Sequence, residues 1–530
     1  MTTVHTDRFA TTRSYSARIT AVFSFFLILL SGLTYGVFGL QHDMAQTGGV
    51  LTTLSLILLA SALFTALVFE FVNGFHDTAN AVATVIYTNS MPPPIAVMWS
   101  GFFNFLGVLL SSGAVAFGVI ALLPVELILQ VGSGKGFAMV FALLIAAVSW
   151  NLATWYFGLP ASSSHTLIGS ILGVGLVNGL MSNKFGSGVD WAQAAKVGYA
   201  LLLSPLTGFS LAVLTLFLIK FVIRNPNLHV PPQGKEPPPL WIRAIAVATC
   251  TGVSFAHGSN DGQKGIGLIM LILVGMLPVT YAFNYAAPAS QINALNQAQQ
   301  KAFNVLPVPT PALDGTGARQ VLSDYLSSRQ YQAQTLNALS TVLTEVHNEV
   351  SRAKGFNKLN ADQVNVVRKD LYLITEVMRR TQKDPQAKGK LNAEQQSALI
   401  ELSHAIDAMT RFIPTWVKVM VALALGLGTM VGWKRIVITV GEKIGKDRLT
   451  YAQGSSAELV TMMTISAANI YGLPVSTTHV LSSAVTGTMV ANGTGLQLKT
   501  VRNIVMAWIL TLPAAIVLSG GLYALFSLFV

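Results

Sequence analysis

The chain has 530 residues, of which 52% are hydrophobic and only 10% are charged, and its mean hydropathy is positive. Soluble domains carry about 25% charged residues, so this composition excludes an ordinary soluble protein and indicates a chain embedded in a bilayer. The net charge of +11 does not indicate a nucleic-acid binder, because the basic residues lack the interleaved aromatics that stack on bases. The single cysteine, Cys250, excludes a disulfide framework and a cysteine metal site.

Apolar runs near the roughly 20 residues that cross a hydrocarbon core recur along the chain. They are Ile19–Leu40, Leu51–Val72, Phe137–Leu159, Ala200–Val222 and Trp416–Val431. No alternation typical of a β-barrel competes with them, so we predict an all-α polytopic membrane protein with about 10 to 12 membrane-spanning helices. The first run is longer than the apolar core of a signal peptide, and residues 1–50 are therefore interpreted as a tail and a retained extra helix.

Clusters of basic residues indicate which loops face the cytoplasm. Such residues fill one short loop and flank another: Lys434, Arg435, Lys443, Lys446 and Arg448 in the first, and Arg224, Lys235 and Arg243 in the second. We therefore predict that residues 224–242 form a cytoplasmic linker, in a multi-pass protein of the bacterial inner (cytoplasmic) membrane.

The apolar pattern disappears over residues 286–411, which hold 25 of the 55 charged residues of the chain. Apolar residues at three- and four-residue spacings in Ala333–Val350 and Ala361–Thr381 predict amphipathic helices, and hence a small soluble helical insert. One spanning element separates the insert from each cytoplasmic loop, so counting places it outside the cytoplasm.

Two motifs occur twice, in the same order. Asn73-Gly-Phe-His-Asp-Thr-Ala-Asn-Ala81 is echoed by His257-Gly-Ser-Asn-Asp-Gly-Gln-Lys-Gly265, and Gly158-Leu-Pro-Ala-Ser-Ser-Ser-His-Thr166 by Gly472-Leu-Pro-Val-Ser-Thr-Thr-His-Val480. The motifs lie 85 positions apart in the first half and 215 in the second, and the difference of 130 nearly equals the 126 residues of the insert.

The repeats divide the chain into two related halves. We predict a first transport repeat over residues 51–223, and a second that begins at 243–285 and resumes after the insert at 412–530. Matched, glycine- or proline-interrupted apolar segments are typical of transporters whose site lies near mid-membrane at the repeat interface. An odd number of crossings in each half would make the repeats inverted, which we expect.

The repeated motifs carry the candidate site. Asp77 and Asp261 stand in apolar surroundings, where an unpaired charge costs at least about 2.5 kcal/mol, so each needs a partner. Each Gly-Leu-Pro must break or begin a helix, and a helix start offers free backbone N–H groups to an oxyanion. The hydroxyls that follow add donors: Ser162, Ser163 and Ser164 in one half, and Ser476, Thr477 and Thr478 in the other. Structural carboxylates and ordinary N-capping remain the alternative interpretations.

Residues Gly74–Ala81 and Gly258–Gly265 resemble the twice-repeated Gly-Ala-Asn-Asp-Val-Ala-Asn-Ala signature of the PiT family of inorganic phosphate transporters. Pro474–His479 matches the family's Pro-Val-Ser-Thr-Thr-His motif, and the resemblance is closest to the bacterial Pit proteins. It implies broken helices and re-entrant hydroxyl hairpins, with Asn80 and Asn260 joining the two hydroxyl clusters around phosphate. It also implies coupling cations against Asp77 and Asp261.

The chain departs from the signature at His76 and at Gln263-Lys264, and both changes can add positive charge. Lys264 offers no oxygen ligand to sodium, and its ammonium would repel a nearby cation. We therefore expect proton symport, in which His76 relays protons, Lys264 replaces one cation and Glu70, two helical turns before Asp77, extends the path. His76 as a hydrogen-bonded structural residue and Glu70 as a partner of a basic residue are the alternatives.

The resemblance further implies that phosphate travels as a neutral complex with a divalent metal such as magnesium, although no ligand set with recognisable spacing stands out in the sequence. We expect no cofactor other than the coupling protons, no nucleic-acid partner and no enzymatic activity; a homodimer is left open. Sulfate or another tetrahedral oxyanion and sodium coupling are the alternatives within transport, and a membrane-embedded hydrolase is disfavoured because no nucleophile elbow or nucleotide-binding loop occurs.

Overall fold

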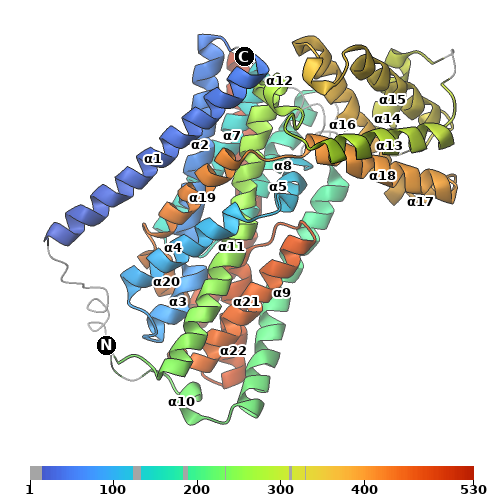
Figure 1. Cartoon of the computed structure of the whole chain (residues 1–530). Helices are drawn as coiled ribbons and strands as arrows, with labels where there is room; N and C mark the ends of the chain where they lie inside the picture. The colour runs from blue at the N-terminus through green and yellow to red at the C-terminus, as the bar shows by residue number, and fades with distance from the viewer. Residues whose placement is uncertain are drawn as a thin grey trace.

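The computed structural model describes residues 15–49, 51–122, 133–182, 189–232, 234, 236–309, 313–328 and 330–530. Within this part the chain is helical and has two bodies, a long bundle and a smaller helical domain that lies against one end of it (Figure 1). Among the described residues, seven helices are long and apolar enough to cross a membrane, or up to nine if each of two bent helix pairs is one span. That number is below the 10 to 12 expected, and shorter helices such as α22 complete the bundle.

The first half of the bundle follows a long N-terminal helix, α1 (Tyr15–Thr47), which crosses the outside of the bundle in Figure 1. Its helices are α2 (Thr53–Asp77), α3 (Ala79–Tyr87), α4 (Pro93–Leu109), α5 (Ala114–Ile120), α7 (Gly134–Tyr156), α8 (Ser163–Met181) and α9 (Trp191–Val222). After the short α10 (Pro226–His229), the second half contains α11 (Leu240–Met276), α12 (Pro278–Tyr281), α19 (Thr415–Thr429), α20 (Lys434–Glu442), α21 (Tyr451–Ile470), α22 (Thr477–Asn492) and α23 (Leu498–Phe526).

The two halves exchange neighbours. Helix α8 packs on α23 and its counterpart α22 packs on α9, while α11 packs on α4 and α2 on α19. Helices that follow the same motif therefore contact the other half of the chain. This crossed packing is what a duplicated unit produces at an interface between its copies.

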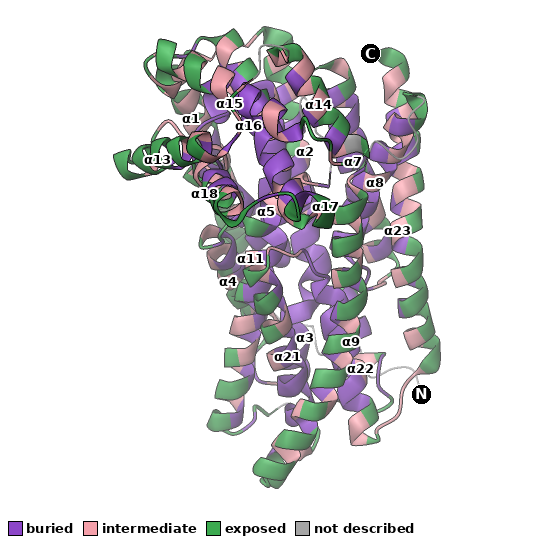
Figure 2. Ribbon diagram, turned by 90° about the vertical axis from the view of Figure 1, so that its right-hand side faces the viewer, coloured by how far each residue is buried: buried purple, intermediate pink, exposed green. Residues whose placement is uncertain are grey.

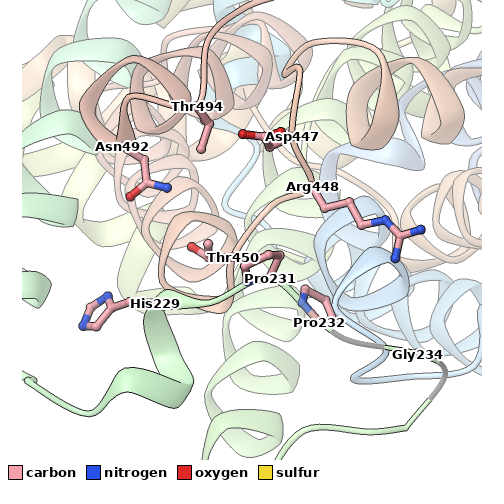
Figure 3. Close-up of a pocket in the computed structure, with 9 residues that line it drawn as sticks. All are labelled: His229, Pro231, Pro232, Gly234, Asp447, Arg448, Thr450, Asn492 and Thr494. Carbon is pink, nitrogen blue, oxygen red and sulfur yellow. The ribbon is translucent and has the colours of Figure 1, made fainter.

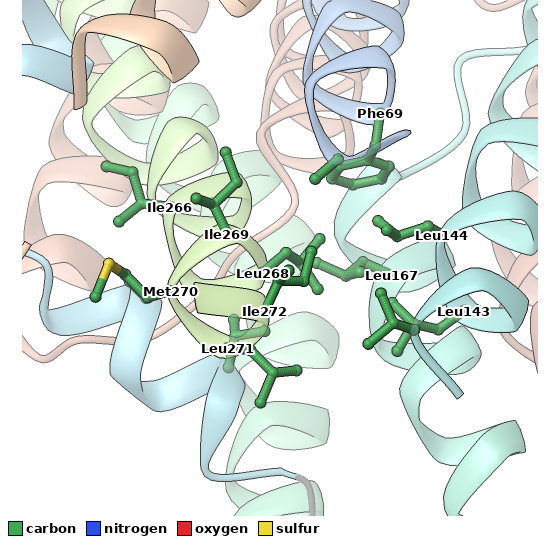
Figure 4. Close-up of a cluster of buried hydrophobic side chains, with 14 of the residues drawn as sticks. Phe69, Leu143, Leu144, Leu167, Ile266, Leu268, Ile269, Met270, Leu271 and Ile272 are labelled. Atoms are coloured by element: carbon green, nitrogen blue, oxygen red, sulfur yellow. The ribbon is translucent and has the colours of Figure 1, made fainter. Parts of the chain in front are cut away.

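Two large apolar clusters and two smaller ones form the core of the described part of the bundle. Figure 4 shows Phe69 of α2, Leu143 and Leu144 of α7, and Leu167 of α8 around the run Ile266–Ile272 of α11. All of these side chains are almost fully buried, whereas the lipid-facing sides of the outer helices remain exposed (Figure 2). A water-free layer of this kind strengthens every electrostatic contact beside it.

The insert contains α13 (Ala289–Val305), α14 (Gly315–Ser328), α15 (Thr335–Arg352), the single turn η2 (Phe356–Lys358), α16 (Ala361–Lys383), α17 (Pro385–Lys388) and α18 (Ala393–Thr410). It has a buried cluster of its own, to which α15 and α16 contribute the apolar faces predicted from their spacing. The insert lies at the opposite end of the molecule from α10 (Figure 1). Which end is cytoplasmic stays a prediction.

One expectation about the helices is wrong. The second repeated motif does not lie at a break, because α11 runs without interruption from Leu240 to Met276. Its glycines serve close packing instead: a Cβ at Gly258 would stand 2.2 Å from the backbone oxygen of Asn104. In the first half the chain passes from α2 to α3 at Thr78, whose dihedral angles are still helical. Bends occur elsewhere, between α4 and α5 at 75° and between α18 and α19 at 73°.

Candidate functional site

Both Gly-Leu-Pro segments end in a helix start with the same geometry. Gly158 and Gly472 adopt left-handed backbone conformations, with φ of 66° and 62°, which a glycine adopts without a steric penalty. The hydroxyl of Ser162 then accepts from the N–H of His165 at 3.1 Å, and that of Ser476 accepts from the N–H of His479 at the same distance. The first hydroxyl of each cluster is therefore an N-cap, and the next two are left to face the centre.

The two clusters meet at one carboxylate. Asp77, at the end of α2 and 2% exposed, accepts a hydrogen bond from Ser163 through Oδ2. Its Oδ1 accepts from the hydroxyl of Thr478, in the other half of the chain, at 2.6 Å. Asn80 of α3 donates to the hydroxyls of Thr477 and Thr478 at 3.0 Å each. Donors from both repeats thus converge on a single buried negative charge.

A second carboxylate lies beside this centre on α11. Lys264 places Nζ 2.8 Å from Oδ2 of Asp261 and donates to the hydroxyl of Ser164 at 2.5 Å. That hydroxyl in turn donates to the carbonyl of Val475 at 2.7 Å. Lys264 is fully buried, so its ammonium compensates Asp261 where water does not screen the pair. The chain of contacts also ties the first hydroxyl cluster to the loop before the second.

His257, which the sequence analysis did not select, completes the group. Its Nε2 is 3.5 Å from Oδ2 of Asp261 and 4.0 Å from Oδ2 of Asp77, and its Nδ1 is 2.8 Å from Oδ1 of Asn104. One ligand atom from each of Asp77, His257 and Asp261 lies within 4.8 Å of the others, which suits a metal ion. The signal was present in the sequence, because His257 precedes Asp261 by four residues and so shares its helix face.

The remaining candidates occupy different places around this centre. His76 lies against Asp77, with Nδ1 3.0 Å from Oδ1, and its Nε2 is 3.1 Å from the hydroxyl of Thr154. Glu70 is fully buried and packs against Gly265, where a Cβ would stand 2.2 Å from its Cγ. Asn260 donates to Asn469 at 2.7 Å and contacts the backbone of Leu473 and Val475, so it holds the loop before α22 rather than the hydroxyls themselves.

The histidines that follow the two clusters lie together. The rings of His165 and His479 have centroids 4.5 Å apart, and His479 also stacks on Trp508 at 4.2 Å. A further buried carboxyl, Glu458 of α21, accepts from the hydroxyl of Thr249 in the contact between α21 and α11.

A hollow at the opposite end from the insert is separate from this centre. It has a volume of about 540 Å³ and is lined by His229, Asp447, Arg448, Thr450 and Asn492 among others (Figure 3). None of the predicted site residues lines it. The cluster of carboxylates and hydroxyls inside the bundle is therefore the candidate transport site.

Comparison with known proteins identifies the family of the chain. A family model described as the phosphate transporter family matches residues 73–519, which span all four motifs. The chain belongs to this family. It is 42% identical over 493 residues to the low-affinity inorganic phosphate transporter PitB of Escherichia coli, and 43% identical over 489 residues to PitA of the same organism. Each alignment covers 88% of this chain and 96% of the relative.

More distant relatives also align over most of the chain. A probable low-affinity inorganic phosphate transporter of Bacillus subtilis is 25% identical and is covered to 97%. A solved structure of a sodium-dependent phosphate transporter matches with a TM-score of 0.50 at 20% identity, covering 89% of this chain and all of that one, which shows a shared fold. The resemblance to the bacterial Pit proteins is confirmed. The chain is a transporter rather than an enzyme, and a multi-pass protein of the bacterial inner membrane.

Proposed function

We propose that this transporter imports inorganic phosphate across the cytoplasmic membrane by proton symport, as a neutral complex with a divalent metal. The observation that carries the proposal is the convergence of Ser163 and Thr478, from the two repeats, on the two oxygens of Asp77. Donors that hold the carboxylate of Asp77 from both sides can hold a tetrahedral oxyanion in the same way. The names of the relatives supply the choice of phosphate.

Phosphate and Asp77 compete for the same donors. The hydroxyls and the ammonium of Lys264 already hold Asp77, Asp261 and each other, so an incoming phosphate takes over contacts that the carboxylate makes in its absence. A phosphate that binds these donors lies beside the carboxylate of Asp77, and two negative charges so close together in a low dielectric repel strongly. Entry of phosphate therefore requires that Asp77 be neutralised, by a proton or by a cation, which gives the coupling a physical cause.

Protons reach Asp77 through its neighbours in this proposal. His76 contacts Asp77 through Nδ1 and the hydroxyl of Thr154 through Nε2, an arrangement that a relay needs. Glu70, buried beside the α11 backbone at Gly265, extends the route toward one end of α2. Lys264 remains a fixed charge that stands in place of one cation.

A divalent metal enters as part of the substrate. Asp77, His257 and Asp261 supply two hard carboxylates and an imidazole, and phosphate oxygens would complete the shell of an ion such as magnesium. A metal hydrogen phosphate is neutral, so one co-transported proton makes import respond to the membrane potential. Sodium coupling is less favoured because the ammonium of Lys264 already compensates the charge of Asp261, whereas a divalent metal arrives together with the negative charge of its phosphate.

We also propose that the halves are inverted repeats and that the insert lies outside the cytoplasm. The crossed packing of α8 on α23 and α22 on α9 supports the first, and the position of the insert opposite α10 supports the second. A homodimer is left open.

Uptake of labelled phosphate into proteoliposomes tests the proposal. An imposed inward proton gradient should drive accumulation that magnesium increases, that sodium does not and that excess sulfate leaves unchanged. Uptake that follows a sodium gradient and ignores the proton gradient would overturn the coupling. Competition by sulfate at equal concentration would overturn the substrate.

A further inference from the structure

A small cavity lies where the insert meets the bundle. Its volume is about 110 Å³, and it is lined by α5, the end of α11, α16 and α18. One face of α16 supplies Arg368, Tyr372 and Thr375, while Phe117 of α5 and Thr410 of α18 lie across from it. Pockets for drug-sized ligands measure about 300 to 1,000 Å³, so this one has room only for a small ion and a few waters.

Arg368 is the unusual group in this cavity. It is only 8% exposed, and its Nη1 donates to the carbonyl of Val274 at 3.1 Å. Its Nε is buried without a hydrogen-bond partner, and no carboxylate among the described residues pairs with it. Burial lowers the pKa of Arg368 to about 10, so the guanidinium is still charged at neutral pH.

The carboxylates of the cavity have other partners. Arg379 binds Asp407 at 2.6 Å and also contacts Glu376, and Arg411 reaches Asp407 at 3.0 Å. Both acids of the lining therefore pair with Arg379 and Arg411, and Arg368 leaves the lining with one excess positive charge. A buried guanidinium with an unused donor and no acid is a binding position for an anion.

We propose that this cavity is a second binding site for a small inorganic oxyanion, in which Arg368 is the charged ligand. The proposal rests on the proposed function, because it takes the transported phosphate as the anion that reaches this surface. Val274 lies ten residues beyond Lys264 on α11, about 15 Å along the helix, so the cavity is distinct from the central site.

Helix α5 connects the two places. The N–H of Val115 donates to Oε1 of Gln263 beside the central site at 2.9 Å, and Phe117 and Ile120 of the same helix line the cavity. An anion bound at Arg368 would lie on the side of α5 that faces the insert. Its effect would be to raise the local phosphate concentration before transport.

The alternative role of Arg368 is structural. Val274 has one of the last carbonyls of α11, and a cation at a helix C-terminus is stabilising without any ligand. The two roles make different predictions. If Arg368 is only structural, phosphate does not bind in the cavity and does not protect a side chain there from a reagent.

Thiol labelling separates them. The native Cys250 is fully buried, so a cysteine introduced by Thr410→Cys reports on the cavity alone. The purified full-length variant would be treated with a neutral maleimide at increasing inorganic phosphate, and the labelling rate measured. The chain with only Cys250 gives the background. Phosphate should slow the labelling of Thr410→Cys.

A second substitution, added to Thr410→Cys, tests whether protection by phosphate depends on Arg368. Adding Arg368→Met should raise the phosphate concentration for half-protection about tenfold to hundredfold. Lys369→Gln, which removes the same charge from the exposed side of α16, should leave it unchanged. If Arg368→Met does not fold, Arg368→Lys keeps the charge but loses the planar fork and should weaken protection, as judged on folded protein.

Absence of protection in Thr410→Cys, or equal protection in the Arg368 variants, would overturn the second site. Adding Asp77→Asn should leave protection intact; its loss there would show that the signal comes from the central site and would also overturn the proposal. Loss of protection with normal phosphate uptake refutes the cavity alone, whereas protection without any phosphate uptake refutes the proposed function.

Discussion

Removal of the Lys264 ammonium should destabilise the protein strongly, because it leaves Asp261 as a buried charge. In the structure Nζ lies 2.8 Å from Asp261 and 2.5 Å from the hydroxyl of Ser164, and both ionic partners are about 1% exposed. His257, whose Nε2 is 3.5 Å from Oδ2 of Asp261, is the nearest other basic side chain and lies farther away than Lys264. Loss of one member of a buried ion pair costs about 3 to 5 kcal/mol, and we expect Lys264→Met to fall in this range.

The double variant Lys264→Met with Asp261→Asn is the matched control. It removes both charges, so no uncompensated ion remains and most of the stability should return. Thermal unfolding of the purified protein in one detergent would rank wild type and double variant together, above Lys264→Met. Phosphate uptake should be lost in both variants, since both lack site groups. A double variant as unstable as Lys264→Met would refute the assignment of the loss to the unpaired charge.

Further variants test packing, the hydroxyl donors and the metal. Gly74→Ala should prevent folding, because its Cβ would stand 2.3 Å from a backbone oxygen of α19. In the control Gly198→Ala the added Cβ has no neighbouring atom within 4 Å, so this variant should fold normally. The yield of monodisperse protein measures both outcomes. Thr478→Val removes a donor to Asp77 and should reduce uptake tenfold or more, at a stability cost of about 1 to 3 kcal/mol because it leaves a buried partner unpaired. Ser476→Ala removes only an N-cap and should cost about 1 kcal/mol of stability while keeping most of the uptake; equal uptake in the two would contradict the distinction. Asn104→Leu removes the hydrogen-bond partner of His257 and should raise the magnesium concentration for half-maximal uptake by about 10-fold to 100-fold. An unchanged magnesium dependence would count against a metal at His257.

The helix starts could be predicted because their chemistry is local. A Gly-Leu-Pro followed by hydroxyl residues specifies a left-handed glycine, an interruption and an N-cap within one short segment. Both copies have this conformation at Gly158 and Gly472. The apolar runs likewise predict spanning helices, because a hydrocarbon core requires every backbone group to be paired within its own helix.

Long-range pairings could not be predicted from the same signals. Nothing in either motif indicates that Ser163 and Thr478 share one carboxylate, because this depends on how the halves pack. The glycines of the second motif suggested a broken helix, whereas they let α4 approach α11 closely at Gly258. The repeated motif does not single out His257, because its role depends on its position one helical turn before Asp261, on the same helix face.

The most direct test of coupled phosphate import through the two-repeat centre compares Asp77→Asn with Asp43→Asn in proteoliposomes under an inward proton gradient. The control makes the same chemical change at a carboxylate of α1 that accepts from Tyr281 and Trp416, outside the centre. We predict that proton-driven uptake of labelled phosphate is abolished in Asp77→Asn and retained in Asp43→Asn. Undiminished uptake by Asp77→Asn would contradict the account.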